Sequence, residues 1–181
     1  YKHQVDPYHP LGDLRITTTT QHPFTQYRRR LDFSTGEVAV TWRDGDETFE
    51  RRVFVSRADN AVVLRFRGDN GRKVDCTAAL IPHSTERFDH GPVDKAPSTF
   101  ERLAEGQFIQ LTGTYHRGGQ FGAVGKVIAR GSGVAAQPGN MVTFMHKGHD
   151  ALKFNQVVMT DADEILVLVK VSVGWLAVSN I

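Results

Sequence analysis

Residues Gln26–Gly45 have the sequence QYRRRLDFSTGEVAVTWRDG, in which three consecutive arginines precede an apolar run. The arginines fit either a basic patch for nucleic acid or a strand whose side chains point alternately to two faces. At a period of two, one face carries Tyr27, Arg29, Leu31 and Phe33. This alternation favours the strand, because a basic stretch without stacking aromatics or a recognised module is a weak signal for nucleic acid.

Two turn signals divide the stretch into a β-meander. Ser34-Thr35-Gly36 follows the first strand, and Asp44-Gly45 is a hairpin turn in which glycine tolerates the positive φ. The next strand is expected at Thr48–Ser56, so the arginines belong to the first of three strands. The hairpin also brings carboxylates close enough to pair with the arginines, namely Asp44, Asp46, Glu47 and Glu50.

Composition limits the class of protein. The chain has 181 residues, enough for one domain with its own core, and 22 basic against 20 acidic residues argue against a polyanion binder. No apolar run approaches the length that spans a bilayer, so no membrane partner is expected. The single cysteine, Cys76, excludes an internal disulfide and does not indicate a compartment. It alternates with polar residues in Lys73–Ile81, which predicts a buried structural thiol.

The rest of the chain predicts nearly pure β structure. Further strands are expected at Gly12–Thr18, Ala61–Arg67, Lys73–Ile81, Gln107–Thr114, Phe121–Arg130, Met141–His146, Lys153–Thr160 and Glu164–Val173. The last strand is apolar on both faces up to Lys170, which predicts a central, buried position. About ten strands in one domain over residues 1–181 indicate an antiparallel two-sheet sandwich.

A long loop insertion interrupts the strands at Pro82–Glu105. It holds three prolines and two histidines, and it allows a short helical turn near Ser98–Leu103. Loops of this length tend to be functional or mobile. The acids grouped there, Glu86, Asp89 and Asp94, fit a solvated loop better than a catalytic pair.

Other catalytic and metal patterns are weak. His146-Lys147-Gly148-His149-Asp150 has an H-x-x-H spacing, but it lacks the spacings of known metal families and suits a polar turn. No nucleophile elbow supports Ser-His-Asp catalysis. Trp42 alternates with Val38 and Val40, so core packing is favoured over stacking on a sugar. We therefore expect no catalytic residue, no metal and no cofactor.

Three ordered segments resemble a known family. They are PLGDLRI (Pro10–Ile16), YRRRLDFSTGEVAVTW (Tyr27–Trp42) and FERRVFVSRADNAVVLRF (Phe49–Phe66), and they resemble the amino-terminal β-domain of family 95 glycoside hydrolases, the α-L-fucosidase type. FNQVVMTDADEILVLVKVSVGW (Phe154–Trp175) is similar to the segment that closes that domain. The resemblance is specific from Pro10 to about Leu80, extends over Gln107–Trp175, and leaves the long loop as an insertion.

The resemblance implies a super-sandwich of the galactose-mutarotase-like form. It also implies that catalysis resides in a separate carboxy-terminal (α/α)₆ barrel, from which no catalytic residue can be carried over. The family's opening segment would lie upstream of Tyr1, so the sandwich would be incomplete at its amino-terminal end. An incomplete sandwich exposes a sheet edge, at which a second copy could pair as a homodimer.

The first hypothesis is therefore a non-catalytic domain that supports the barrel of an α-L-fucosidase-like hydrolase. If residues of this chain touch carbohydrate, His83, Arg87 and His90 of the long loop are the candidates, because they can donate hydrogen bonds to sugar hydroxyls. The alternative is a stand-alone carbohydrate-binding or protein-interaction module. A third hypothesis is a small hydrolase using Glu86, Asp89 or Glu101.

Overall fold

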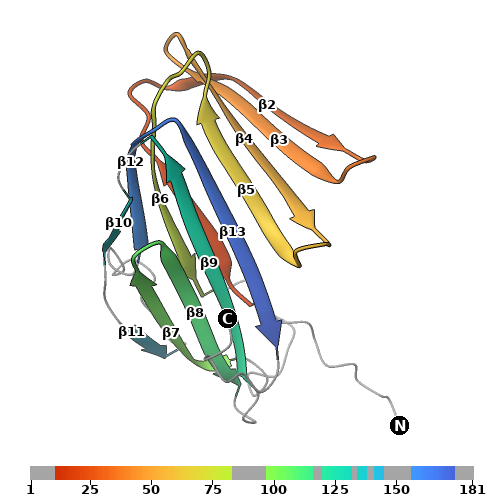
Figure 1. Cartoon of the computed structure of the whole chain (residues 1–181), viewed down its shortest axis with the longest axis vertical. Helices are drawn as coiled ribbons and strands as arrows, with labels where there is room; N and C mark the ends of the chain where they lie inside the picture. Colours follow the sequence, from red (N-terminus) through yellow and green to blue (C-terminus); the bar gives the residue numbers. More distant parts are fainter. Residues whose placement is uncertain are drawn as a thin grey trace.

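A computed structural model describes residues 11–82, 97–115, 120–131, 134–137, 141–144 and 156–173. Within these ranges the side chains of residues 97–101, 115, 134–137, 141–144 and 172–173 are not described. The described residues form thirteen strands and no helix (Figure 1). The strands are β1 (Asp13–Thr18), β2 (Phe24–Asp32), β3 (Glu37–Asp44), β4 (Glu47–Ser56), β5 (Ala61–Gly68), β6 (Val74–Ile81), β7 (Pro97–Glu105), β8 (Phe108–Tyr115), β9 (Gln120–Arg130), β10 (Val134–Gln137), β11 (Met141–Phe144), β12 (Gln156–Ala162) and β13 (Glu164–Val173).

The strands form two antiparallel sheets that pack face to face. The small sheet has the order β1-β6-β12-β10, and the large sheet has the order β11-β7-β8-β9-β13-β5-β4-β3-β2. The core lies between them, where the inner faces of β5, β8, β9 and β13 meet those of β6 and β12. The all-β, two-sheet sandwich predicted from the sequence is confirmed.

The predicted helical turn near Ser98–Leu103 is wrong. Residues 97–105 form β7, which pairs with β8 on one side and β11 on the other. Arg102 and Ala104 alternate into the interior at 1% and 0% exposure, so sheet pairing and burial override the helical tendency of this Glu-Arg-Leu-Ala run. The predicted loop thus ends in a strand, and residues 83–96 lie outside the described part. β10 was not predicted.

β13 occupies the centre of the large sheet, between β9 and β5, as predicted. Its two faces differ in burial. Ile165 and Val167 are fully buried against the small sheet, whereas Leu166 and Leu168 on the opposite face are only half-buried. The apolar run therefore marks the central strand, but only one of its faces belongs to the core.

The large sheet extends beyond the small one. Figure 1 shows β2, β3 and β4 at the upper right, away from β6, β10 and β12. We call these three strands the overhang. Its inner face, which continues the face that bears the core, leaves large apolar side chains exposed, including Phe24 at 61%, Tyr27 at 47% and Leu31 at 49%.

The arginine run lies in β2, at the edge of the large sheet, as the meander prediction required. Charged side chains on such an edge discourage pairing with other chains. The expected pairing with the hairpin carboxylates is wrong, because Arg28 and Arg29 lie opposite Thr41 and Val40, away from the turn. The carboxylates instead contact other partners, and Arg30 pairs with Asp32 at 3.6 Å.

Candidate functional site

The sugar-binding candidates His83, Arg87 and His90 lie outside the described residues, as does the H-x-x-H segment at 146–150. The same holds for Glu86 and Asp89, and the side chain of Glu101 is not described. These assignments remain predictions. In the described ranges, no group of three or more His, Cys, Asp or Glu side chains could hold a metal ion.

A polar pocket opens where the overhang meets the end of the small sheet. Its floor is aromatic: Trp42 of β3 stacks on Phe49 of β4 and Phe66 of β5, with ring centroids 5.8 and 5.6 Å apart and planes tilted by 22°. Such offset stacking adds to the stability that burial alone provides. The prediction that Trp42 packs on the core is confirmed, yet the same ring also borders this pocket.

The walls of the polar pocket carry hydrogen-bonding groups. They are Thr18, Thr19, Thr20, Gln21, Asp44, Glu47, Arg72, Lys73 and Asp75. The cavity volume of about 70 Å³ admits a few water molecules or one edge of a ligand ring. Sequence reasoning did not single out residues 18–21, although the run Thr17-Thr18-Thr19-Thr20-Gln21, which begins at the end of β1, is a signal of clustered hydroxyls.

Asp44 fixes one wall of the pocket. It is 5% exposed, and its carboxylate accepts hydrogen bonds from the backbone N–H groups of Gln21 and His22, each at 2.7 Å. Burial alone would raise the pKa of Asp44. The hydrogen bonds have the opposite effect and outweigh burial, so the pKa of Asp44 lies below its ordinary value. Asp44 therefore stays ionised and holds residues 21 and 22 against the β3–β4 hairpin.

The two cations of the pocket are also held in place. The Nε of Arg72 contacts Oε2 of Glu47 at 2.6 Å, and the Nζ of Lys73 donates to Oδ1 of Asp163 at 2.5 Å. The contact with Asp163 raises the pKa of Lys73. These pairs orient the charged groups, and they leave the pocket with mixed rather than single-sign charge.

A β-bulge places two further aromatic side chains beside the pocket. Thr25 lies opposite Arg43 and Arg28 opposite Thr41, so Gln26 and Tyr27 both stand opposite Trp42. Gln26 has a φ of 50°, a left-handed conformation that is uncommon for a residue other than glycine. Phe24 and Tyr27 have ring centroids 6.1 Å apart. The bulge thus brings exposed rings to the face that carries Trp42.

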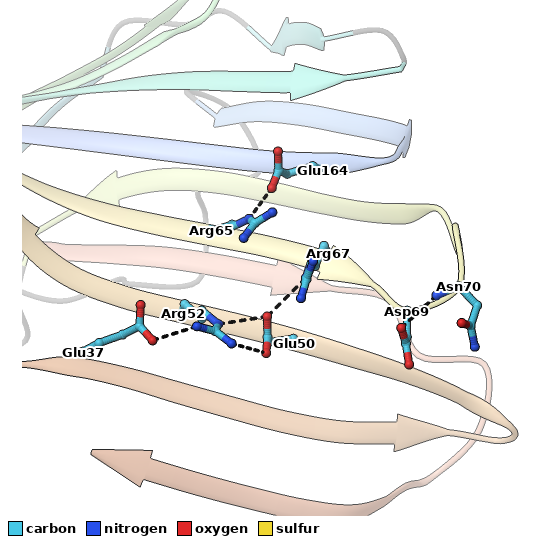
Figure 2. A network of polar contacts seen from close by, with 8 residues as sticks. All are labelled: Glu37, Glu50, Arg52, Arg65, Arg67, Asp69, Asn70 and Glu164. Carbon is cyan, nitrogen blue, oxygen red and sulfur yellow. Dashed lines mark hydrogen bonds and ion pairs between the residues drawn. The ribbon is translucent and has the colours of Figure 1, made fainter. Parts of the chain in front are cut away.

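The outer face of the large sheet has a different character. Figure 2 shows Glu50 of β4 between Arg52 and Arg67, at 3.0 and 3.2 Å, with Glu37 on the far side of Arg52. Glu164 of β13 contacts Arg65 in the same view. The hydrogen bond from Arg52 is the largest of the effects that lower the pKa of Glu50. These carboxylates form a structural charge ladder across the strands.

Cys76 is a buried thiol, as predicted. It is 4% exposed, its Sγ lies 3.9 Å from Sδ of Met159, and burial raises its pKa to about 12. Such a thiol is not a nucleophile near neutral pH.

Comparisons with known proteins identify the type of domain. Residues 1–172 match the family model described as "Glycosyl hydrolase family 65, N-terminal domain". The expected amino-terminal domain of a glycoside hydrolase is confirmed, but the family that the match supports is 65, not 95. No curated protein matches the chain.

Among solved structures, the chain shows similarity to "Putative kojibiose phosphorylase from human microbiome". Its sequence identity to this chain is 12% and the TM-score is 0.47. The alignment covers 88% of this chain and 22% of that chain, so this chain spans about a fifth of that protein's length. Among the described residues, no helix is long and apolar enough to cross a membrane.

Proposed function

The chain belongs to the amino-terminal domains of glycosyl hydrolase family 65, and from this premise we propose that it is a non-catalytic β-sandwich that supports a separate catalytic barrel. The whole protein acts on carbohydrate, as a glycosidase or a phosphorylase. The α-L-fucosidase type suggested by the sequence resemblance is one substrate class among those to be tested.

The state of the described carboxylates is the observation that carries the non-catalytic role. A glycosidase needs one carboxyl group with a raised pKa, which protonates the leaving group, and a second carboxylate facing it across the sugar. Here the pKa values of Asp44 and Glu50 are lowered, and Glu164 contacts both Arg65 and Arg130. The lowered pKa values keep Asp44 and Glu50 ionised, and all three carboxylates are held by hydrogen bonds or ion pairs, which suits structural contacts rather than proton transfer.

Activity of two proteins tests this proposal. The 181-residue chain and the full-length native protein are assayed with 4-nitrophenyl α-L-fucoside and α-D-glucoside, and with α-linked glucose disaccharides in phosphate buffer. We expect turnover only by the full-length protein. Turnover by the chain alone would overturn the proposal if it depended on the loop carboxylates. In that case Glu101→Gln or Asp89→Asn would abolish the activity, whereas the control Glu50→Gln would retain it, and the small-hydrolase hypothesis would be established.

The stand-alone module is a second candidate, favoured by the aromatic floor and hydroxyl-bearing walls of the polar pocket. The two candidates differ in the size of the native protein. An antibody against this chain detects a band several times larger than 20.2 kDa if the chain is one domain of an enzyme. A band at 20.2 kDa would favour the module.

A further inference from the structure

The inner face of the overhang is apolar but largely uncovered. One row of side chains runs across it from Leu31 of β2 through Val38 and Val53, and this row continues into the buried Leu64 of β5. Leu31 is 49% exposed, and Val55 on the same face is 67% exposed. The face therefore continues the core beyond the edge of the small sheet. A contiguous apolar surface of this kind is typical of an interaction site.

The turn that follows β2 adds a protruding aromatic side chain. Phe33 is 91% exposed. The backbone around it is fixed by the carboxylate of Asp32, which accepts hydrogen bonds from the N–H of Ser34 at 2.9 Å and from its hydroxyl at 2.6 Å. The N–H of Gly36 also donates to the carbonyl of Asp32 at 2.8 Å. Because this backbone is already ordered, covering the Phe33 ring costs little conformational entropy.

Two arginines give the same face a positive charge. Arg29 of β2 and Arg51 of β4 both lie opposite Val40 of β3, so they share one cross-strand row and are separated by about 10 Å. Within the described ranges, neither guanidinium has a carboxylate partner. Asp44 and Glu47, the acids at the end of this face, are already engaged by other groups. The unpaired charges of the face are therefore positive.

The outer face of β4 and β5 lacks this imbalance. Its arginines each contact a carboxylate of the same face (Figure 2), namely Arg52, Arg65 and Arg67. Phe54 on this face is 38% exposed, which is less than the 67% of the neighbouring Val55 on the inner face. The inner face is therefore the one that leaves both apolar surface and charge without partners in the described part of the chain.

We propose that the inner face of the overhang is the surface on which the second domain of the full-length protein docks. This inference rests on the proposed function, which supplies that domain, and it adds the face and the chemistry of the contact. The docking surface of the second domain is apolar and covers Leu31, Phe33 and Val55. It carries two carboxylates, about 10 Å apart, that pair with Arg29 and Arg51. Aromatic and arginine side chains are enriched at such interfaces.

Cysteine labelling of the full-length native protein tests which face is covered. Val55→Cys and Phe54→Cys place a thiol at adjacent positions of β4 on opposite faces, and the buried Cys76 does not interfere. Each labelling rate is measured by peptide mass spectrometry and divided by the rate of the same variant in denaturing urea. Although Val55 is the more exposed residue in this chain, Val55→Cys is expected to label at least about tenfold more slowly than Phe54→Cys.

A charge reversal tests the ion pairs. Arg29→Glu places a negative charge against the carboxylates of the second domain, and it is expected to speed the labelling of Val55→Cys at least about fivefold. Arg28→Glu is the matched control, because Arg28 is an exposed arginine on the outer face of the same strand and should leave the rate unchanged. Circular dichroism confirms that every variant retains the fold of the parent protein.

Three outcomes overturn the proposal. The first is that Val55→Cys labels as fast as Phe54→Cys or faster, which would leave the inner face open. The second is protection that disappears on dilution, which would make a second copy the occupant. The third is an equal effect of Arg29→Glu and Arg28→Glu on the labelling rate. The activity assay judges the non-catalytic role and does not depend on which face is covered, so this inference and the proposed function fail separately.

Discussion

The carboxylate of Asp44 accepts two hydrogen bonds from His22, one from its backbone N–H at 2.7 Å and one at 3.1 Å from ring atom Nδ1. His22 precedes β2, whereas Asp44 ends β3, so these bonds join the two ends of the overhang's first hairpin. The His22 ring also covers Gly45, whose added Cβ would lie 3.1 Å from Nδ1. The contact therefore sets the shape of the polar pocket at its outer wall.

Replacement of Asp44 should destabilise the fold more than replacement of its neighbour in the turn. Asp44→Ala removes the acceptor of three hydrogen bonds and leaves the N–H groups of Gln21 and His22 without it. Asp46 is fully exposed and pairs only with Arg43 at the surface, so Asp46→Ala is the matched control. Urea denaturation should give a lower midpoint for Asp44→Ala than for Asp46→Ala, and equal midpoints would contradict the structural role.

The same carboxylate predicts a loss of stability in acid. The pKa of Asp44 is lower in the folded state than its ordinary value of 3.8, so the stability it contributes is present above that value. This contribution is lost as the pH falls through the folded pKa. Asp44→Asn should therefore show a smaller loss of stability than the wild type when urea midpoints at pH 6 and pH 2.5 are compared. An equal loss of stability in Asp44→Asn and in the wild type would show that protonation of Asp44 does not cause the acid sensitivity.

Alternation and turn chemistry account for the parts of the fold that the sequence predicts. The β2–β5 meander and β13 follow from local patterns, because each strand has one apolar face and each turn of the meander has a residue with positive φ, namely Gly36, Gly45 and Asn60. β7 was not predicted in this way, because the run Glu101–Ala104 favours a helix, and its extended form depends on pairing with β8 and β11 and on the burial of Arg102.

The polar pocket shows the limit of sequence reasoning for the site. Its floor joins residues of β3, β4 and β5, and its walls add residues 18–21 and Arg72, which only the tertiary fold brings together. The hydroxyl-rich run was visible in the sequence, but its proximity to Trp42 was not. The bulge at Gln26 was also hidden, because period-two alternation assumes a regular strand.

The two faces of β13 should respond differently to truncation. Ile165 is fully buried in the core, whereas Leu166 lies on the half-buried outer face opposite Arg65. Ile165→Ala should lower the free energy of unfolding by about 2–5 kcal/mol, and Leu166→Ala by clearly less. Equilibrium urea unfolding measures both. A larger cost for Leu166→Ala would mean that the outer face is covered in the protein as it exists in solution.

Cys76 should be inert in the folded protein. Burial raises its pKa to about 12, so almost no thiolate forms at pH 8, and the neighbouring Met159 closes access to the sulfur. Labelling with 5,5′-dithiobis(2-nitrobenzoate) should be slow without denaturant and stoichiometric in 8 M urea. Fast labelling of the native protein would show that the two sheets separate readily, because the Cys76 side chain belongs to the core between them.

Gly113 is required by the aromatic ring that lies across from it. Gly113 of β8 pairs with Phe121 of β9, and a Cβ added at Gly113 would lie 2.2 Å from the Phe121 ring. Because this ring is buried at 1% exposure and has no room to shift, Gly113→Ala should lower the free energy of unfolding by about 1–3 kcal/mol. Thr112→Ala is the control on the outer face of the same strand. In a double-mutant cycle, Phe121→Leu should reduce the cost of Gly113→Ala, and additive costs would show that the ring is not what excludes the side chain.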